Sequence, residues 1–162
     1  MRRFVLAAFA FALVAACQPA SNELTDYQKA EIAAEVELIH GQFWDAWRET
    51  DFEKGMSYYL NSPEFTFSYQ GQMVSGYSAF RDLGESAFAN VASQTISFAE
   101  SKTTVLAADV VSITAQGTYV PTDTAGVTGA EATFAFTTVW VQRDGEWKVL
   151  VSSNSEPTVV SP

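Results

Sequence analysis

Apolar residues follow a helical period in the first part of this chain and a strand period in the last part. In the first part they recur at the i, i+4, i+7 and i+11 spacing of one helical face, at Ile32, Val36, Ile39, Phe43 and Trp47. From Gln94 onward that spacing disappears, and three long β-rich runs follow at 95–106, 110–119 and 130–155. Because helices and strands are segregated instead of alternating, the sequence predicts an α+β fold with an antiparallel sheet.

Capping and turn residues divide the first part into three helices and a hairpin. Thr25 and Gln28 have capping-box spacing, which predicts a long helix over residues 26–49. Asp51 can cap a second, shorter helix, although a glycine weakens it, and Ser78 can cap a third that runs to about residue 88. Residues 65–74 alternate at period two around a Gln-Gly turn, which predicts a small hairpin between the second and third helices.

The Asp144-Gly145 pair fixes the register expected of the final hairpin, because Asp-Gly favours a two-residue type I′ loop. One face should then carry the large aromatics and the other a half-apolar set that includes Val139, Val141 and Leu150. The inward face is expected to pair Trp140 with Val149, Thr138 with Val151, and Phe136 with Ser153. The outward face predicts a homodimer contact between sheets, unless its apolar residues are simply exposed ones that need no partner.

The N-terminus has the layout of an export signal. Arg2 and Arg3 precede an uncharged run at 4–16, which is shorter than the roughly 20 residues that a transmembrane helix needs. The run ends Leu-Val-Ala-Ala before Cys17, which resembles the lipobox of bacterial lipoproteins. That resemblance implies that Cys17 becomes the lipidated first residue, and Gln18 after it implies the outer membrane, facing the periplasm. A plain signal peptide followed by a chance cysteine is the alternative.

These boundaries divide the chain into a signal peptide at 1–16, a polar tether at 17–24, one folded domain at 25–156 and a tail at 157–162. Loss of the two signal arginines leaves seven basic residues against 19 acidic ones, a formal net charge of −12. The composition therefore predicts no nucleic-acid partner and no polybasic lipid contact, so the lipid anchor alone should hold the protein to the membrane. The single cysteine excludes an intrachain disulfide.

The order of these elements resembles the nuclear transport factor 2-like superfamily, particularly its SnoaL-like and uncharacterised small-domain branches. The similarity covers residues 25–155 and is best over the final hairpin, whose sequence runs Asp-Gly-Glu-Trp-Lys-Val. It implies a cone-shaped α+β barrel in which a strongly curved sheet wraps the long helix, with a pocket between them. Members include isomerases, dehydratases, cyclases and non-catalytic binding or scaffold domains, so the fold leaves the function open.

No catalytic residue can be assigned from the sequence. The resemblance places Phe43 where isomerases of the family carry a tyrosine, and Phe67 or Ser68 where they carry the base; none of these fits that role. His40, the only histidine, is either a packed residue beside the buried stripe or a proton carrier. Among the carboxylates, Glu100 and Glu131 lie in or beside strands, but the sequence does not fix the register of these strands and so does not tell which face of the sheet the two side chains are on.

Aromatic residues are the remaining functional signal. The elements that line the family's pocket carry the expected ligand-binding residues Phe43, Trp47, Tyr59, Phe67, Tyr69, Phe136, Thr138 and Ser153. Such a set predicts a domain that binds a small apolar ligand or a protein partner; the alternatives are a filled core and a cofactor-independent isomerase or lyase. No cofactor and no metal are expected, because the chain lacks a second histidine and a spaced carboxylate cluster.

Overall fold

The fold is described from a computed structural model, which covers residues 23–156. The elements follow one another as α1 (Asp26–Arg48), α2 (Phe52–Ser57), β1 (Thr66–Tyr69), β2 (Gln72–Ser75), α3 (Tyr77–Phe88), β3 (Val91–Ala107), β4 (Val110–Asp123), β5 (Ala132–Arg143) and β6 (Glu146–Ser155). The predicted α+β order is therefore confirmed. The predicted signal peptide, Cys17, most of the tether and the C-terminal tail lie outside the described residues. Within residues 23–156 no helix is long and apolar enough to cross a membrane.

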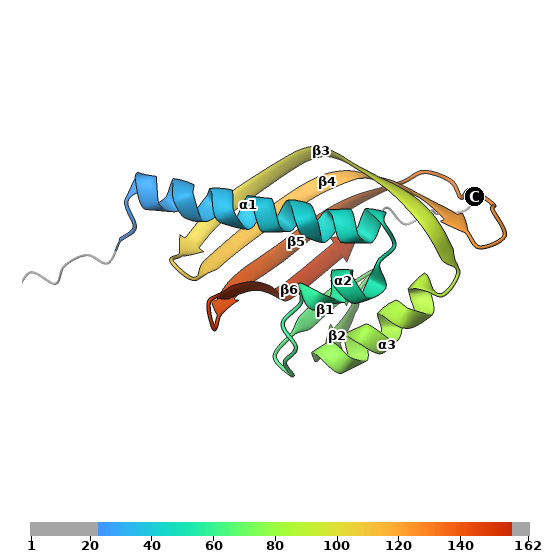
Figure 1. The fold of residues 1–162 in the computed structure, drawn as a ribbon, viewed down its shortest axis with the longest axis horizontal. Coiled ribbons are helices and arrows are strands. Elements are labelled where there is room, and N and C mark those ends of the chain that lie inside the picture. Colours follow the sequence, from blue (N-terminus) through green and yellow to red (C-terminus); the bar gives the residue numbers. More distant parts are fainter. Residues whose placement is uncertain (1–22, 157–162) are drawn as a thin grey trace, which may run out of the picture.

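The six strands form one curved sheet in the order β2-β1-β6-β5-β4-β3, and α1 lies along its concave side (Figure 1). Neighbouring strands are antiparallel except β1 and β6, which run parallel with Phe67 opposite Ser152. The expectation of a purely antiparallel sheet is wrong at this one pairing. A parallel pair needs a long crossover, and the chain between β1 and β6 supplies one.

Two of the three predicted helix starts are confirmed. Thr25 Oγ1 accepts a hydrogen bond from the Gln28 backbone N–H at 3.2 Å, and the Gln28 side chain accepts one from the Thr25 N–H at 2.9 Å. The Asp51 carboxylate accepts one from the backbone N–H of Lys54. The third helix begins at Tyr77 after Gly76, whose φ of 88° suits glycine, so Ser78 lies inside the first turn and does not cap it.

Two glycines allow close approaches that shape the interior. A Cβ on Gly55 of α2 would lie 2.8 Å from the Trp47 indole, so glycine lets α2 pack on α1 despite its low helix propensity. A Cβ on Gly117 of β4 would lie 2.0 Å from the Ser97 carbonyl oxygen on β3. Near this contact the β3–β4 register shifts between Phe98 and Glu100. Bulges of this kind bend a sheet and strengthen its twist.

The final hairpin has the predicted turn but not the predicted register along its whole length. Asp144 and Gly145 both have positive φ, and opposed residues match the expectation as far as Trp140 with Val149. Beyond that pair Leu150 is an extra residue on β6, so Val139 faces Val151 and Phe136 faces Asn154. One inserted residue moves every later side chain to the other face.

The inward face of the sheet holds the core under α1, as predicted. Trp140 and Thr138 are fully buried, and Phe134 and Phe136 are nearly so. On the outward face Val141 is already buried within the monomer, whereas Val139 and Leu150 are half-buried. The outward apolar set is therefore smaller than expected from the sequence, although the bulge adds Val151 to it.

Candidate functional site

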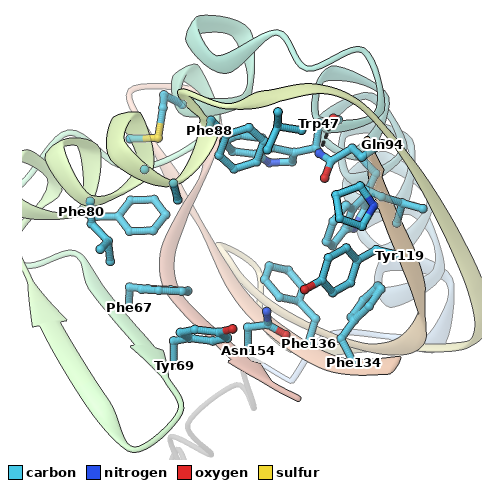
Figure 2. A pocket seen from close by; sticks show the side chains of 18 of the residues that line it. Trp47, Phe67, Tyr69, Phe80, Phe88, Gln94, Tyr119, Phe134, Phe136 and Asn154 are labelled. Atoms are coloured by element: carbon cyan, nitrogen blue, oxygen red, sulfur yellow. Dashed lines mark hydrogen bonds between the residues drawn. The ribbon is translucent and has the colours of Figure 1, made fainter. Parts of the chain in front are cut away.

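A hollow of about 480 Å³ opens between the C-terminal half of α1, helices α2 and α3, and the inward face of the sheet (Figure 2). We call it the pocket. Its walls are almost entirely apolar and aromatic, and they come from elements far apart in the sequence. The lining residues include Phe43, Trp44, Trp47, Met56, Tyr59, Phe67, Tyr69, Phe80, Leu83, Ala87, Phe88, Gln94, Ile96, Tyr119, Pro121, Phe134, Phe136, Asn154 and Glu156.

Six of the eight residues expected to bind a ligand lie together on this pocket, namely Phe43, Trp47, Tyr59, Phe67, Tyr69 and Phe136. The other two do not. Thr138 is fully buried, and its Oγ1 accepts a hydrogen bond from the Trp140 indole N–H at 2.9 Å. Ser153 faces the opposite side of the sheet because of the bulge, and its Oγ accepts a hydrogen bond from the Ser68 hydroxyl at 2.8 Å. It lines a second hollow beside β1 and β5, which shares Tyr69, Asn154 and Glu156 with the pocket.

Helix α3 forms one wall of the pocket. Helical spacing puts Phe80, Leu83 and Ala87 on one face of α3, and all three line the pocket. Phe80 is buried against Phe65 and Phe67, whereas Leu83 keeps 45% of its surface exposed because it borders the opening. Inward-facing positions on α3 are therefore partly solvent-accessible, which is typical of a pocket wall rather than of a core.

A carboxylate that sequence reasoning missed lies at one end of the pocket. Glu156 Oε2 accepts a hydrogen bond from the Tyr69 hydroxyl at 2.9 Å, and Oε1 accepts one from the Asn154 side-chain amide at 3.3 Å. Burial, and then the contact with Glu156, raises the pKa of Tyr69 to about 12. Burial and the Glu156 charge also raise the pKa of Tyr119. Both phenols therefore stay protonated around a charged acceptor.

Two further polar side chains face the pocket. The Gln94 amide nitrogen donates to the Trp47 carbonyl oxygen at 2.6 Å, which leaves the amide oxygen on the pocket side (Figure 2). Tyr59 is buried beside Trp47 on the pocket wall, and burial raises the pKa of its hydroxyl. Within residues 23–156, no lysine, arginine or histidine lines the pocket. Its polar groups are therefore neutral hydroxyl and amide groups and one carboxylate.

His40 lies in the core and does not line the pocket. This position supports a packed residue over a proton carrier. Its Nε2 accepts a hydrogen bond from the Trp44 indole at 3.0 Å, so the proton of the neutral ring is on Nδ1. The Phe43, Trp44 and Trp140 rings surround it at centroid distances of 5.8 to 6.1 Å. Burial lowers the pKa of His40 to about 4, so the ring is neutral near pH 7.

The two strand carboxylates considered from the sequence face away from the pocket. Glu100 is exposed on the outward face opposite Gln116, and Glu131 is exposed beside the second hollow. The part of the chain that the structure describes contains no group of three His, Cys, Asp or Glu side chains placed to hold a metal ion. Glu156 is therefore the one carboxylate among residues 23–156 that lines the pocket.

The fold is that of a known class of small α+β domains. The model of the SnoaL-like domain matches residues 36–159, so the chain belongs to this family. A comparison with curated proteins finds no significant match.

Solved structures share the fold at low sequence identity. A proposed dehydratase of the NTF2-like family from Streptomyces avermitilis is 16% identical with a TM-score of 0.69, over 80% of this chain and 99% of that one. An NTF2-like protein from Salmonella enterica serovar Typhimurium is 14% identical with a TM-score of 0.69, over 82% of this chain and 95% of that one. A ketosteroid isomerase-like protein from Erwinia carotovora atroseptica is 18% identical with a TM-score of 0.65, over 82% of this chain and 98% of that one. These likenesses show the cone fold and leave the chemistry to the site.

Proposed function

We propose that this domain binds a small, mainly apolar molecule in the pocket. One observation carries the proposal: aromatic side chains from α1, α2, α3 and the sheet converge on a 480 Å³ space and do not fill it. Natural cores are close-packed, so a space of this size walled by aromatic rings is unusual unless something occupies it. The volume lies within the range of small-ligand sites, and burial of apolar surface would supply most of the binding free energy.

A neutral fluorescent probe tests this proposal. N-phenylnaphthylamine should bind the purified protein with a blue-shifted emission, and Phe67→Ala should weaken binding by about tenfold through lost apolar contact. Phe67 is only half-buried, so the variant should keep its circular dichroism spectrum. Leu106→Ala is the matched control, because Leu106 is 61% exposed and does not line the pocket. Equal affinities for both variants, or no binding to the wild type, would contradict the proposal.

A cofactor-independent isomerase or lyase is the second candidate, and Glu156 favours it. A carboxylate beside the hydroxyl groups of Tyr69 and Tyr119 could remove a proton from a bound carbon acid while a phenol hydrogen-bonds the developing oxyanion. The fold likeness to the ketosteroid isomerase-like protein is consistent with such chemistry. Loss of substrate C–H signals in D₂O, followed by NMR for a panel of small cyclic ketones, would support this candidate if Glu156→Gln abolished it. Absence of exchange would favour binding alone.

We propose further that the mature protein is anchored to the outer membrane through lipid on Cys17, facing the periplasm. The residues that precede Cys17 support this proposal. Cys17→Ser should leave an unlipidated protein, detected by its mass and by loss from the membrane fraction, whereas Ser21→Ala should change neither. Stable anchoring needs more than one acyl chain, since a single chain binds only marginally. Unchanged mass and membrane retention of the Cys17 variant would contradict the proposal.

A homodimer through the outward sheet face is a separate proposal, and it also applies if the domain is an interaction module without a ligand. Val139, Leu150 and Val151 support it as a half-buried apolar group. Val139→Lys should shift the protein toward monomer in sedimentation velocity, because an unpaired ammonium is costly to bury at a contact. Val139→Thr keeps the shape and should have a smaller effect. A wild type that is monomeric at high concentration would exclude the dimer.

A further inference from the structure

We propose that the ligand of this pocket has a protonated amine on an apolar body, and that Glu156 binds the amine. This inference rests on the proposed ligand-binding function and specifies the chemical class of the ligand. The alternatives are a neutral ligand and an anionic one. The placement of charge, the supply of free acceptors and the aromatic surroundings of Glu156 separate these three classes.

Charge placement is the first argument. Glu156 lines the pocket and has no cationic partner among residues 23–156, where its two oxygens accept from the neutral Tyr69 hydroxyl and the neutral Asn154 amide. These two donors fix the orientation of the carboxylate without neutralising it. A carboxylate has about four acceptor sites, so two hydrogen bonds leave capacity for a ligand. A charge-assisted N–H bond from an ammonium is the strong interaction available there.

The supply of acceptors is the second argument. The Gln94 amide oxygen faces the pocket, because its nitrogen donates to the Trp47 carbonyl. Asn154 also lines the pocket, and its amide nitrogen donates to Glu156, so it orients the carboxylate toward a ligand. A ligand that donates hydrogen bonds can pair with both the Gln94 oxygen and the carboxylate. An ammonium brings three donors, whereas a carboxylate or phosphate brings only further acceptors.

The aromatic surroundings are the third argument. Tyr69 and Tyr119 both adjoin Glu156. The rings of Phe67 and Tyr69 stack at 6.2 Å, and those of Tyr119 and Phe134 lie 6.3 Å apart, all on the pocket wall (Figure 2). Aromatic faces attract cations, and the attraction grows when the cation is partly desolvated. An anionic ligand would instead meet Glu156 without a compensating lysine, arginine or histidine from the described lining residues. Both effects favour a cationic group over an anionic one.

Three probes of nearly the same shape test the inference by isothermal titration calorimetry on the purified protein. Naphthylmethylamine, naphthylmethanol and naphthoic acid share the ring system and differ in the polar group. We expect the amine to bind about tenfold more tightly than the alcohol, and the acid to bind more weakly than both. Higher salt should weaken amine binding but not alcohol binding, because only the amine pairs with a charge.

Two variants locate the effect. Glu156→Gln should lower amine affinity about tenfold and alcohol affinity much less, because glutamine keeps an acceptor but loses the charge. Glu100→Gln removes the same unit charge from the outward face and should leave all three affinities unchanged. Equal binding of amine and alcohol, or an amine affinity that Glu156→Gln does not alter, would overturn this inference while ligand binding itself stands. Binding of none of the three probes would overturn the proposed function and this inference together.

Discussion

Two regions under α1 use the same kinds of side chain but differ in how completely these fill the space. In the first, which we call the packed end, Trp140, Val111 and Val36 have no exposed surface. In the second, the pocket end, Phe67 and Tyr69 are half-buried and face a hollow bordered by α3. Aromatic content therefore does not distinguish a core from a binding site. The distinction depends on whether the converging elements close the space between them.

The two ends differ in the charge of their polar groups. At the packed end the indole of Trp44 donates to His40 and that of Trp140 donates to Thr138, so neutral groups pair with one another inside the core. At the pocket end the Glu156 carboxylate accepts from the Tyr69 hydroxyl and the Asn154 amide. Buried polar atoms without a partner occur at both ends among residues 23–156, namely His40 Nδ1 and Asn154 Oδ1, so unpaired atoms do not separate a core from a pocket. A carboxylate on the wall does separate them.

Truncation at the packed end should have the largest effect on stability. Trp140→Ala should lower the free energy of unfolding by about 3–5 kcal/mol, because it removes a fully buried indole and leaves a cavity. Phe67→Ala, at the pocket end, should cost only about 1–2 kcal/mol, since part of its surface already faces open space. Urea denaturation followed by far-ultraviolet circular dichroism measures both. Equal losses would show that the pocket end is as tightly packed as the other.

Acidification should destabilise the packed end through His40. Burial lowers the pKa of His40 from its ordinary value of 6.5 to about 4 in the folded protein, so the unfolded chain takes up the proton first. The contribution to stability is therefore complete above about pH 6.5 and decreases as the pH falls toward about 4. The full change is about 3 kcal/mol.

The His40→Gln variant isolates this effect, because the carboxylates that also titrate in acid remain in it. Glutamine keeps an acceptor for the Trp44 indole and does not titrate. The difference in unfolding free energy between wild type and variant should therefore change with pH, with the wild type losing more stability between pH 7 and pH 4.5. Parallel pH profiles for the two proteins would show that His40 is charged in the fold or exposed to solvent.

Local signals in the sequence were sufficient for most of the fold. The capping residues Thr25 and Asp51 fixed two helix starts, and Asp144-Gly145 fixed the last turn. The parallel pairing of β1 with β6 could not be predicted in this way, because it joins strands that are more than 80 residues apart and no local pattern encodes it. Ser78 failed as a cap because Gly76, with its positive φ, starts the helix earlier.

The residues of the site could be predicted from the sequence only where the predicted β5–β6 register is correct. The aromatic wall follows from side-chain periodicity, and six of its residues were expected. The polar end was missed because Leu150 adds one residue to β6, which turns Ser153 outward and brings Ser152 and Asn154 inward. Once this shift is known, the alternation of side chains along a strand predicts that Glu156, two residues after Asn154, also faces inward. A bulge of this kind depends on the bend of the whole sheet, so the hairpin sequence does not reveal it.

The smallest expected effect on stability comes from filling the pocket, and it separates the two ends most directly. Ala87 lies on the pocket wall of α3 and is exposed, so Ala87→Phe places a ring in unfilled space without displacing packed atoms. We expect the free energy of unfolding to change by about 0.5 kcal/mol or less, because the gain in buried apolar surface offsets the lower helix propensity of phenylalanine. Binding of N-phenylnaphthylamine should nevertheless weaken at least about tenfold. Ser86→Phe on the neighbouring position of α3, which does not line the pocket, should leave that binding unchanged. A large destabilisation by Ala87→Phe would mean that the pocket is closed in solution, and the contrast between the two ends would then be lost.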